Sequence, residues 1–280
     1  MMQSVPNTQE PGKEVRHILS LSGGKDSTAL AVYLKDRIPD LEYVFCDTGE
    51  ELPGTLDYLT KIEAYLGKKI VYLNPDRPFR HYLQIYRGVL PDPRARWCTR
   101  MLKIKPFERF IKDDPVMLYV GIRYDERHRK GYISTKPNIT SSFPFIENGI
   151  NLDGVIHILD KSGLGLPAYY SWRSRSGCYF CFFQQKLEWI GLLENHPDLF
   201  EEAMKFEKFN SETGESYTWI KNESLAQIKE KYTPEGTDAL RERYLRLCKN
   251  KTANTPKATL LEIFETAMNE NKDGCLICHL

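Results

Sequence analysis

The sequence has no long hydrophobic run and almost no excess of charge of either sign. No stretch approaches the roughly 18 consecutive apolar residues of a membrane-spanning helix, so we expect no membrane association. The first 13 residues are polar and lack the apolar core of a secretory signal peptide. Seven cysteines in 280 residues are an odd number in a chain that is not small. This excludes a secreted disulfide scaffold and predicts a protein of the reducing cytoplasm.

The chain does have an ordinary globular composition, with 41% hydrophobic and 28% charged residues. That is enough apolar material for a sizeable core, and it excludes fibrous and wholly disordered classes. We predict three parts. They are a disordered leader over residues 1–14, a nucleotide-binding domain over 15–190 and a helical region over 191–280.

The near-zero net charge conceals a basic segment in the middle of the chain. Residues 77–130 contain fourteen Lys and Arg against six Asp and Glu. Such a segment in a neutral protein indicates an anionic ligand, either a nucleotide or a nucleic acid. The alternative is a solvated face whose charges pair with one another.

Short apolar segments alternate with amphipathic ones in the first part of the chain. The pattern predicts strands at 17–21, 41–46 and 69–73, separated by helices at 27–37 and 55–66. This β-α-β-α-β order predicts an α/β fold with a doubly wound, mostly parallel sheet of five or six strands. The later pattern predicts a loop at 76–97, a helix at 105–112, a strand at 116–122, a mobile loop at 123–144, and helices at 152–162 and 188–209, the last interrupted near Pro197.

A glycine-containing turn lies between the first predicted strand and the first predicted helix. Its glycines let the backbone approach a ligand closely, and the following helix adds the positive end of its dipole. Lys25 would neutralise phosphate charge, and Asp26 could hold Mg²⁺. The spacing differs from a Walker A loop. The residues predicted to bind a phosphate or pyrophosphate are Ser20, Ser22, Gly23, Gly24, Lys25, Asp26 and Ser27.

Basic and acidic side chains near other strand ends extend this site. Arg123 follows the strand predicted at 116–122, and so it should lie at the carboxyl edge of the sheet, where doubly wound folds bind ligands. Arg100, Lys103 and Arg123 could clamp phosphates. Asp47, after the second strand, could meet a ribose or a metal. The aromatic residues Tyr169, Tyr170 and Trp172 would either stack bases or form a hydrophobic wall.

Two Cys-X-X-Cys pairs stand in the second half of the chain. Cys178 and Cys181 are flanked by aromatic residues, a setting that suits an iron–sulfur centre. Structural zinc, or no metal at all, are the alternatives. Cys275 and Cys278 could relay sulfur or form a reversible disulfide, or belong to a disordered end without a role. Cys46 and Cys248 sit in apolar stretches and are predicted to be core residues.

Taken together, these motifs resemble the PP-loop ATP pyrophosphatase superfamily, and within it the phosphoadenosine phosphosulfate (PAPS) and adenosine phosphosulfate (APS) reductase-like family. The resemblance covers about residues 18–189. It departs from the cluster-bearing APS reductases at Trp97, where they have a second cysteine, and at Arg127, where the family has serine. The segments that carry it, in family order, are Ser22-Gly23-Gly24-Lys25-Asp26-Ser27, Asp47-Thr48-Gly49, Trp97-Cys98-Thr99-Arg100 with Lys103, Gly121-Ile122-Arg123, and Gly177-Cys178 with Cys181.

The resemblance implies roles for these residues. Lys25, Asp26 and Arg123 would be catalytic, with Mg-ATP bound by the phosphate turn and by Asp47, Thr48, Gly49, Arg100, Lys103 and Gly121. Cys98 matches a cluster ligand, so Cys98, Cys178 and Cys181 would hold a 4Fe-4S cluster. Three thiolates would leave one iron open to sulfide, as in tRNA-thiolating relatives.

The function that this reading predicts is adenylation of an acceptor for sulfur transfer. It resembles the adenylating component of DNA phosphorothioation systems, with a nucleic acid as acceptor (DNA rather than tRNA) and a cysteine desulfurase as sulfur donor. The chain could form a homo-oligomer or be a subunit of a complex. One alternative is a PAPS or APS reductase, which uses no ATP. Another is a nucleotide-binding subunit without turnover.

Overall fold

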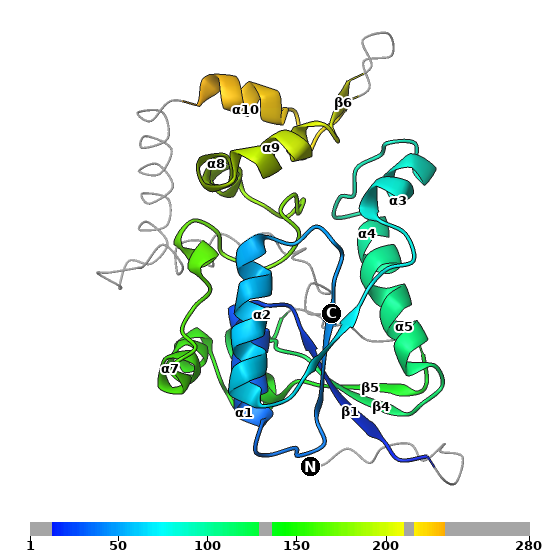
Figure 1. Ribbon diagram of the computed structural model, residues 1–280, viewed down its shortest axis with the longest axis vertical. Coiled ribbons are helices and arrows are strands. Elements are labelled where there is room, and N and C mark those ends of the chain that lie inside the picture. The colour runs from blue at the N-terminus through cyan, green and yellow to red at the C-terminus, as the bar shows by residue number, and fades with distance from the viewer. Residues whose placement is uncertain (1–12, 129–135, 210–215, 233–280) are drawn as a thin grey trace.

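The computed structural model describes residues 13–128, 136–209 and 216–232. Its centre is a five-stranded sheet in which every pairing is parallel, with strand order β3-β2-β1-β4-β5 (Figure 1). The predicted α/β fold with a parallel sheet is therefore confirmed. The strands are β1 (Arg16–Leu21), β2 (Glu42–Cys46), β3 (Ile70–Leu73), β4 (Val116–Tyr119) and β5 (Ile139–Ser142).

Helices cover both faces of this sheet. One face carries α1, α2 and α7, and the other carries α5 with the turns that precede it (Figure 1). The bounds are α1 (Lys25–Leu34), α2 (Pro53–Leu66), α3 (Phe79–Ile85), α4 (Trp97–Thr99), the π-helical turn η1 (Arg100–Ile104), α5 (Lys105–Ile111), the 3₁₀ turns η2 (Tyr124–Glu126) and η3 (Ala168–Ser171), α6 (Pro144–Glu147), α7 (Leu152–Ser162), α8 (Lys186–Asn195), α9 (Pro197–Met204) and α10 (Leu225–Lys231).

The alternation of side chains along the strands explains the two helical layers. Leu19 and Leu21 of β1 are fully buried against α1, α2 and α7. Ile18 points to the opposite face, where it packs with Phe107 and Ile111 of α5. Successive residues of a strand face opposite sides, so a strand covered on both sides reads as a continuous apolar run.

The strand order places a switch point between β1 and β4. The chain moves outward from β1 to β2 and β3, then returns to the other side of β1 to add β4 and β5. Doubly wound sheets bind ligands outside the carboxyl ends of the strands at such a point. The phosphate turn follows β1 and Arg123 follows β4, so the topology brings these two segments to the same place.

A second, aromatic core lies beyond that edge of the sheet. It joins α3, α8, α9 and α10 to the turn at residues 178–181, called here the cysteine turn, and it contains many buried aromatic rings. Phe79 and Phe180 have ring centroids 4.3 Å apart, and Phe180 stacks on Trp219 at 5.2 Å. The helical stretch predicted at 188–209 is two helices that meet at His196, because Pro197 cannot continue α8. A short hairpin, β6 (Lys208–Phe209) with β7 (Ser216–Tyr217), follows.

Two predicted loops contain regular structure. The loop predicted at 76–97 includes α3, whose buried residues Phe79, Tyr82 and Leu83 have helical spacing over only two turns. The loop predicted at 123–144 includes the edge strand β5, with sequence Ile-Thr-Ser-Ser. Only Ile139 of β5 is buried, so an edge strand of this kind carries almost no hydrophobic signal.

Some predictions fall outside the described residues. They concern most of the leader, Arg129 and Lys130 of the basic segment, Cys248, and the terminal pair Cys275 and Cys278. Over the ranges that the structure describes, no helix has the length and apolar character needed to cross a membrane.

Candidate functional site

The phosphate turn joins β1 to α1 through a network of hydroxyl groups. Ser27 Oγ accepts from the backbone N–H of Ser22 at 3.1 Å and lies 3.0 Å from Ser22 Oγ. Gly23 has φ +68°, a left-handed conformation that glycine adopts without strain. Thr28 Oγ1 donates to the carbonyl of Gly24 at 2.7 Å, which fixes the first turn of α1. The turn is thereby held at the helix N-terminus, the arrangement that suits an anion.

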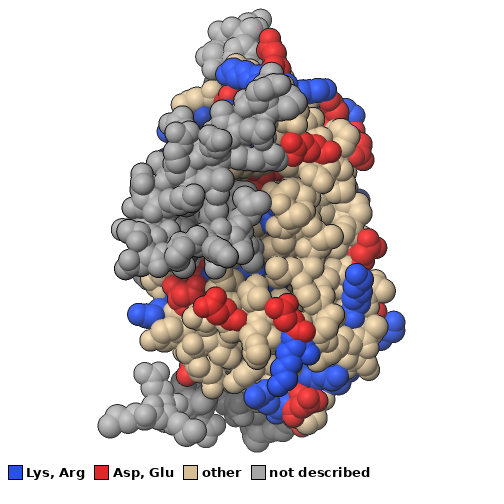
Figure 2. Space-filling model, turned by 90° about the vertical axis from the view of Figure 1, so that its left-hand side faces the viewer, with Lys and Arg blue, Asp and Glu red and all other residues tan. Residues whose placement is uncertain are grey.

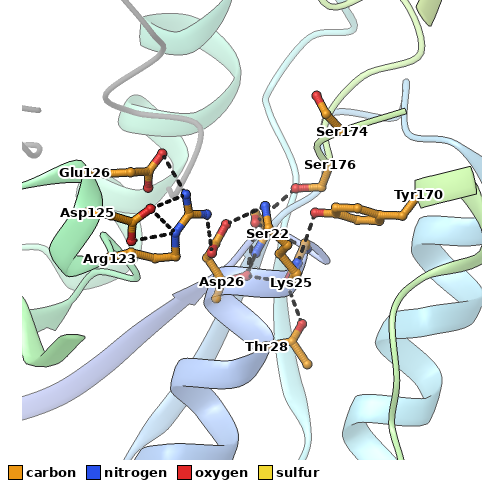
Figure 3. Close-up of polar contacts among 12 residues, drawn as sticks. Ser22, Lys25, Asp26, Thr28, Arg123, Asp125, Glu126, Tyr170, Ser174 and Ser176 are labelled. Atoms are coloured by element: carbon orange, nitrogen blue, oxygen red, sulfur yellow. Dashed lines mark hydrogen bonds and ion pairs between the residues drawn. The ribbon is translucent and has the colours of Figure 1, made fainter. Parts of the chain in front are cut away.

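A buried charge network flanks the turn. Arg123 is 2% exposed and its Nη1 donates to Asp26 Oδ1 at 3.0 Å, while Lys25 Nζ lies 3.2 Å from Asp26 Oδ2 (Figure 3). Asp125 accepts from Arg123 Nη2 at 3.0 Å, and Glu126 lies 3.7 Å from the same nitrogen. Asp26 thus orients both predicted catalytic cations, one with each carboxylate oxygen.

Gly121 lets the end of β4 approach α1. A Cβ atom at this position would lie 3.1 Å from the carbonyl carbon of Asp26 and 3.2 Å from the nitrogen of Ser27. Contacts of this kind with backbone atoms cannot relax by rotating a side chain. The absence of a side chain at Gly121 therefore allows Arg123, two residues later, to reach Asp26.

The three predicted cluster cysteines line one cavity. Cys98 of α4 and the turn residues Cys178 and Cys181 line a cavity of about 40 Å³ that is partly open to solvent. The lining is mainly apolar, with Phe79, Phe180, Phe182 and Leu102 among its residues. Burial raises the pKa of Cys98 to about 11, with the neighbouring Cys181 adding to the effect. Burial raises the pKa of Cys178 well above its usual value.

Polar side chains connect this cavity to the end of β2. Thr48 Oγ1 donates to Glu51 Oε1 at 2.8 Å and lies 3.3 Å from Cys178 Sγ. The backbone of Glu51 forms a bridge with that of Cys178, and Tyr179 N donates to the carbonyl of Glu50 at 2.9 Å.

Lys103 lies in the same cavity on the π-helical turn η1. Desolvation alone would lower its pKa, but Glu51 and the surrounding thiols outweigh that effect and raise it. The positive charge of Lys103 lowers the pKa of Cys98 and of Cys178, against the larger, opposite effect of burial. Single π turns are often found at functional sites.

The donor atoms of the cavity are thiol sulfurs, which bind both structural zinc and iron–sulfur clusters. A tetrahedral zinc site with Zn–S bonds of about 2.3 Å needs thiolates that converge on one point. Within the described ranges, no group of three His, Cys, Asp or Glu is close enough to hold one metal ion. The 4Fe-4S cluster at Cys98, Cys178 and Cys181 therefore stays a prediction.

The remaining predicted ligand residues are less closely gathered. Asp47 accepts from Gly49 N at 2.9 Å and from Asn74 Nδ2 at 3.4 Å, which places it at the tips of β2 and β3. Arg100 is exposed on η1. Ser20 is buried, and its hydroxyl has no hydrogen-bond partner among the residues that the structure describes. Thr48 and Lys103, which were predicted to bind nucleotide, lie with the cysteines.

Several site residues were not assigned from the sequence. Tyr170 and Ser176 place hydroxyl groups on the phosphate turn, and Glu51 pairs with the cysteine turn. Tyr169 and Tyr170 had been interpreted through their rings, as base-stacking or wall residues. Ser176 and Glu51 are close in sequence to family motifs, and that proximity is the one signal that could have singled them out.

The carboxyl of Glu50, which follows β2, provides a test of the electrostatics at the carboxyl edge of the sheet. Burial raises its pKa to about 7, against an opposing effect of Arg80. A carboxyl whose folded pKa is raised favours folding below its unfolded pKa, near 4.5, and loses that contribution as the pH rises through 7. We expect Glu50→Gln to stabilise the protein at pH 8 by about 1 kcal/mol and to have no effect near pH 4.5. A pKa shift corresponds to roughly 1.4 kcal/mol per unit, and the partial exposure of Glu50 reduces this free energy.

Chemical denaturation at the two pH values measures this effect. Glu230→Gln, at an exposed position of α10, is the control and should change nothing at either pH. Equal stability of the wild type and Glu50→Gln at pH 8 would contradict the burial of this charge.

Charges of both signs are interspersed on the face that Figure 2 shows, among the residues described there. Several arginines of the basic segment are paired with acids elsewhere. Arg80 pairs with Glu202, and Arg109 pairs with Asp76. The solvated, salt-bridged interpretation thus holds for part of the segment, while Arg123 serves the site.

The fold and this site define a class of protein: a parallel α/β domain with a phosphate turn at its switch point and a thiol-lined cavity beside it. Residues 16–146 match the sequence profile of the phosphoadenosine phosphosulfate reductase domain. These residues thus match the family that the motifs predict, and the resemblance is confirmed for this part of the chain. The match includes the phosphate turn, Cys98 and Arg123, and it ends before Cys178.

Individual relatives and structures are more distant. An uncharacterized protein of Methanocaldococcus jannaschii is 30% identical over 234 residues, which cover 78% of this chain and 46% of that protein. The chain spans about half the length of the curated relatives that it matches first. The PAPS reductase of Candida auris in its phosphate complex has a TM-score of 0.47 at 13% identity, covering 59% of this chain and 82% of that one. The U34-tRNA thiolase NcsA of Methanococcus maripaludis, with its [4Fe-4S] cluster, has a TM-score of 0.39 at 17% identity, covering 69% of this chain and 70% of that one.

Proposed function

We propose that the protein is an ATP pyrophosphatase that adenylates an acceptor for sulfur transfer. The observation that carries this proposal is the adjacency of two centres. The phosphate turn with Lys25 and Arg123 lies at the switch point, and the thiol cavity is connected to the same edge through Thr48 and Glu51. Nucleotide activation and sulfur delivery need such neighbouring sites.

In the proposed reaction, an oxygen of the acceptor attacks the α-phosphorus of ATP and the bond to the bridging oxygen of the β-phosphate breaks. Pyrophosphate leaves, and the turn N–H groups, Lys25 and Arg123 stabilise its charge. A sulfur nucleophile then displaces AMP from the acceptor. Asp26 holds Lys25 and Arg123 in place, and it would bind Mg²⁺ only by exchanging one of these cations.

The cavity residues have a separate part in this scheme. Cys98, Cys178 and Cys181 would hold a 4Fe-4S cluster, which supplies an iron without a protein thiolate for binding sulfide. Lys103 lies beside the thiols and offsets their negative charge, and the aromatic lining limits access of water. A nucleic acid, DNA rather than tRNA, is the proposed acceptor, and a cysteine desulfurase is the proposed donor.

The products formed from Mg-ATP test this function. With duplex DNA or tRNA and a cysteine desulfurase with cysteine, we expect release of pyrophosphate and AMP, with DNA the better acceptor. Lys25→Ala should lower the rate about 100-fold or more, as for loss of one group that stabilises developing charge. Lys161→Ala, an exposed lysine of α7, is the matched control and should retain the wild-type rate.

The family match favours a second candidate, reduction of PAPS or APS. That reaction requires no ATP and yields sulfite with thioredoxin as reductant. Sulfite formation from PAPS without pyrophosphate release from ATP would replace the proposed function with this one. Nucleotide binding without either product would indicate a non-catalytic subunit.

A further inference from the structure

The cysteine-bearing side of the site touches the phosphate turn directly. The contact is made by residues 169–178, called here the docking segment, which begin within η3 and end at the first thiol of the turn. Three of its hydroxyl groups reach the phosphate turn. Tyr169 donates to the carbonyl of Gly23 at 2.8 Å. Tyr170 accepts from Lys25 N at 3.1 Å, and Ser176 donates to Ser22 Oγ at 3.1 Å (Figure 3).

The Tyr170 hydroxyl occupies a hydrogen-bond donor that a phosphate would use. The N–H of Lys25 is in the first turn of α1, where backbone donors have no partner within the helix. Such donors are the ones that bind phosphate oxygens at a helix N-terminus. Here the Tyr170 oxygen accepts from this N–H, and Lys25 Nζ lies 5.4 Å from the centroid of the same ring. A phosphate oxygen and the Tyr170 hydroxyl therefore compete for one donor.

The docking segment packs closely against the turn and is tied to the thiol. A Cβ atom on Gly24 would lie 2.6 Å from Ser176 Oγ and 3.2 Å from the Tyr170 hydroxyl, so a side chain at position 24 would have to displace these hydroxyls. The fully buried Arg173 donates from Nη2 to the carbonyl of Cys178 at 2.8 Å. A displacement at Tyr170 or Ser176 therefore reaches the Cys178 turn through a short, hydrogen-bonded stretch of chain.

We propose that Tyr170 and Ser176 are positioning residues that couple the phosphate turn to the thiols. In the structure, their hydroxyls hold the docking segment on the turn. Phosphate binding takes the Lys25 N–H from Tyr170 and loosens the segment that carries Cys178. By linkage, the docked segment weakens phosphate binding by the same factor. This coupling rests on the proposed function, because it requires the turn to bind a phosphate.

Calorimetric titration of the full chain with inorganic pyrophosphate and with ATP tests the competition. Tyr170→Phe removes the competing hydroxyl and leaves the Lys25 N–H without its internal partner, so we expect about fivefold tighter binding, the factor of a single hydrogen bond. Ser176→Ala should shift the affinity in the same direction by less. Ser171→Ala is the matched control. It removes a hydroxyl of the same segment that donates to the carbonyl of Ala168 at 3.0 Å and does not touch the phosphate turn, so it should not tighten binding.

Hydrogen–deuterium exchange of residues 169–178 supplies the second measurement. In the wild type, pyrophosphate should raise exchange in the docking segment, whereas in Tyr170→Phe exchange should already be raised without ligand. Weaker binding by Tyr170→Phe, or exchange that pyrophosphate leaves unchanged or lowers, overturns the coupling alone. A wild type that binds neither pyrophosphate nor ATP overturns the proposed function together with this inference.

Discussion

We expect Arg123→Ala to lower the free energy of unfolding by about 3–5 kcal/mol. Arg123 is almost completely buried, and its guanidinium contacts Asp26, Asp125 and Glu126. The side chains of Asp26 and Glu126 are only 11% and 10% exposed. Removing the cation leaves both carboxylates buried without it, and an uncompensated buried charge costs far more than the loss of a surface ion pair.

Urea denaturation followed by circular dichroism measures this loss. The control is Arg127→Ala, four residues away, where an exposed arginine packs over the Tyr124 ring at 4.4 Å. It should change stability by no more than about 0.5 kcal/mol. Adding Asp26→Asn to Arg123→Ala should recover part of the loss, because one of the two buried charges is then removed. A stability of Arg123→Ala equal to that of Arg127→Ala would show that the network does not stabilise the fold.

The second large effect concerns metal content. Protein purified anaerobically should contain about four iron and four sulfide per chain and absorb broadly near about 400 nm. Cys98→Ser, Cys178→Ser and Cys181→Ser should each lose the iron and the absorbance, because the proposed cluster has three protein thiolates. The physical basis is that these three sulfur atoms line one cavity with few polar atoms.

Cys46→Ser is the matched control for this experiment. Cys46 is a buried cysteine at the end of β2, and its Sγ donates to the carbonyl of Lys103 at 3.7 Å without lining the cavity. It should keep its iron. Stoichiometric zinc in the wild type would make the cysteines structural and leave the chemistry to the phosphate turn. Anaerobic protein with no metal would contradict the cluster and favour thiol chemistry at the family's reductase site.

The phosphate turn and the thiol cavity can be tested separately, because different residues form them. Loss of the cluster should leave nucleotide binding measurable, since the phosphate turn is built from β1, α1 and Arg123. Loss of Tyr170 should leave iron content unchanged, since its hydroxyl lies on the turn and not in the cavity. The two sets of variants therefore separate the functions of the two centres.

The sequence alone determined the features that depend on neighbouring residues. The phosphate turn is local, because its strand, its glycines and the start of its helix are consecutive. The central strands are buried on both faces, so they can be predicted from their apolar runs. The parallel sheet then follows from their alternation with helices, and Arg123 is placed at its edge by following a strand.

Only the tertiary structure decided contacts between distant segments. The Tyr170 hydroxyl meets a backbone N–H 145 positions earlier, and a hydroxyl without a partner nearby in sequence has no periodic signature. The sequence does not reveal whether Lys103 faces a phosphate or a thiol, because its charge is the same in both cases. In the structure, Lys103 lies on the π-helical turn η1, which packs against the cavity, and so it faces the thiols. The edge strand β5 joins the sheet through backbone pairing with β4, which its polar side chains do not reveal.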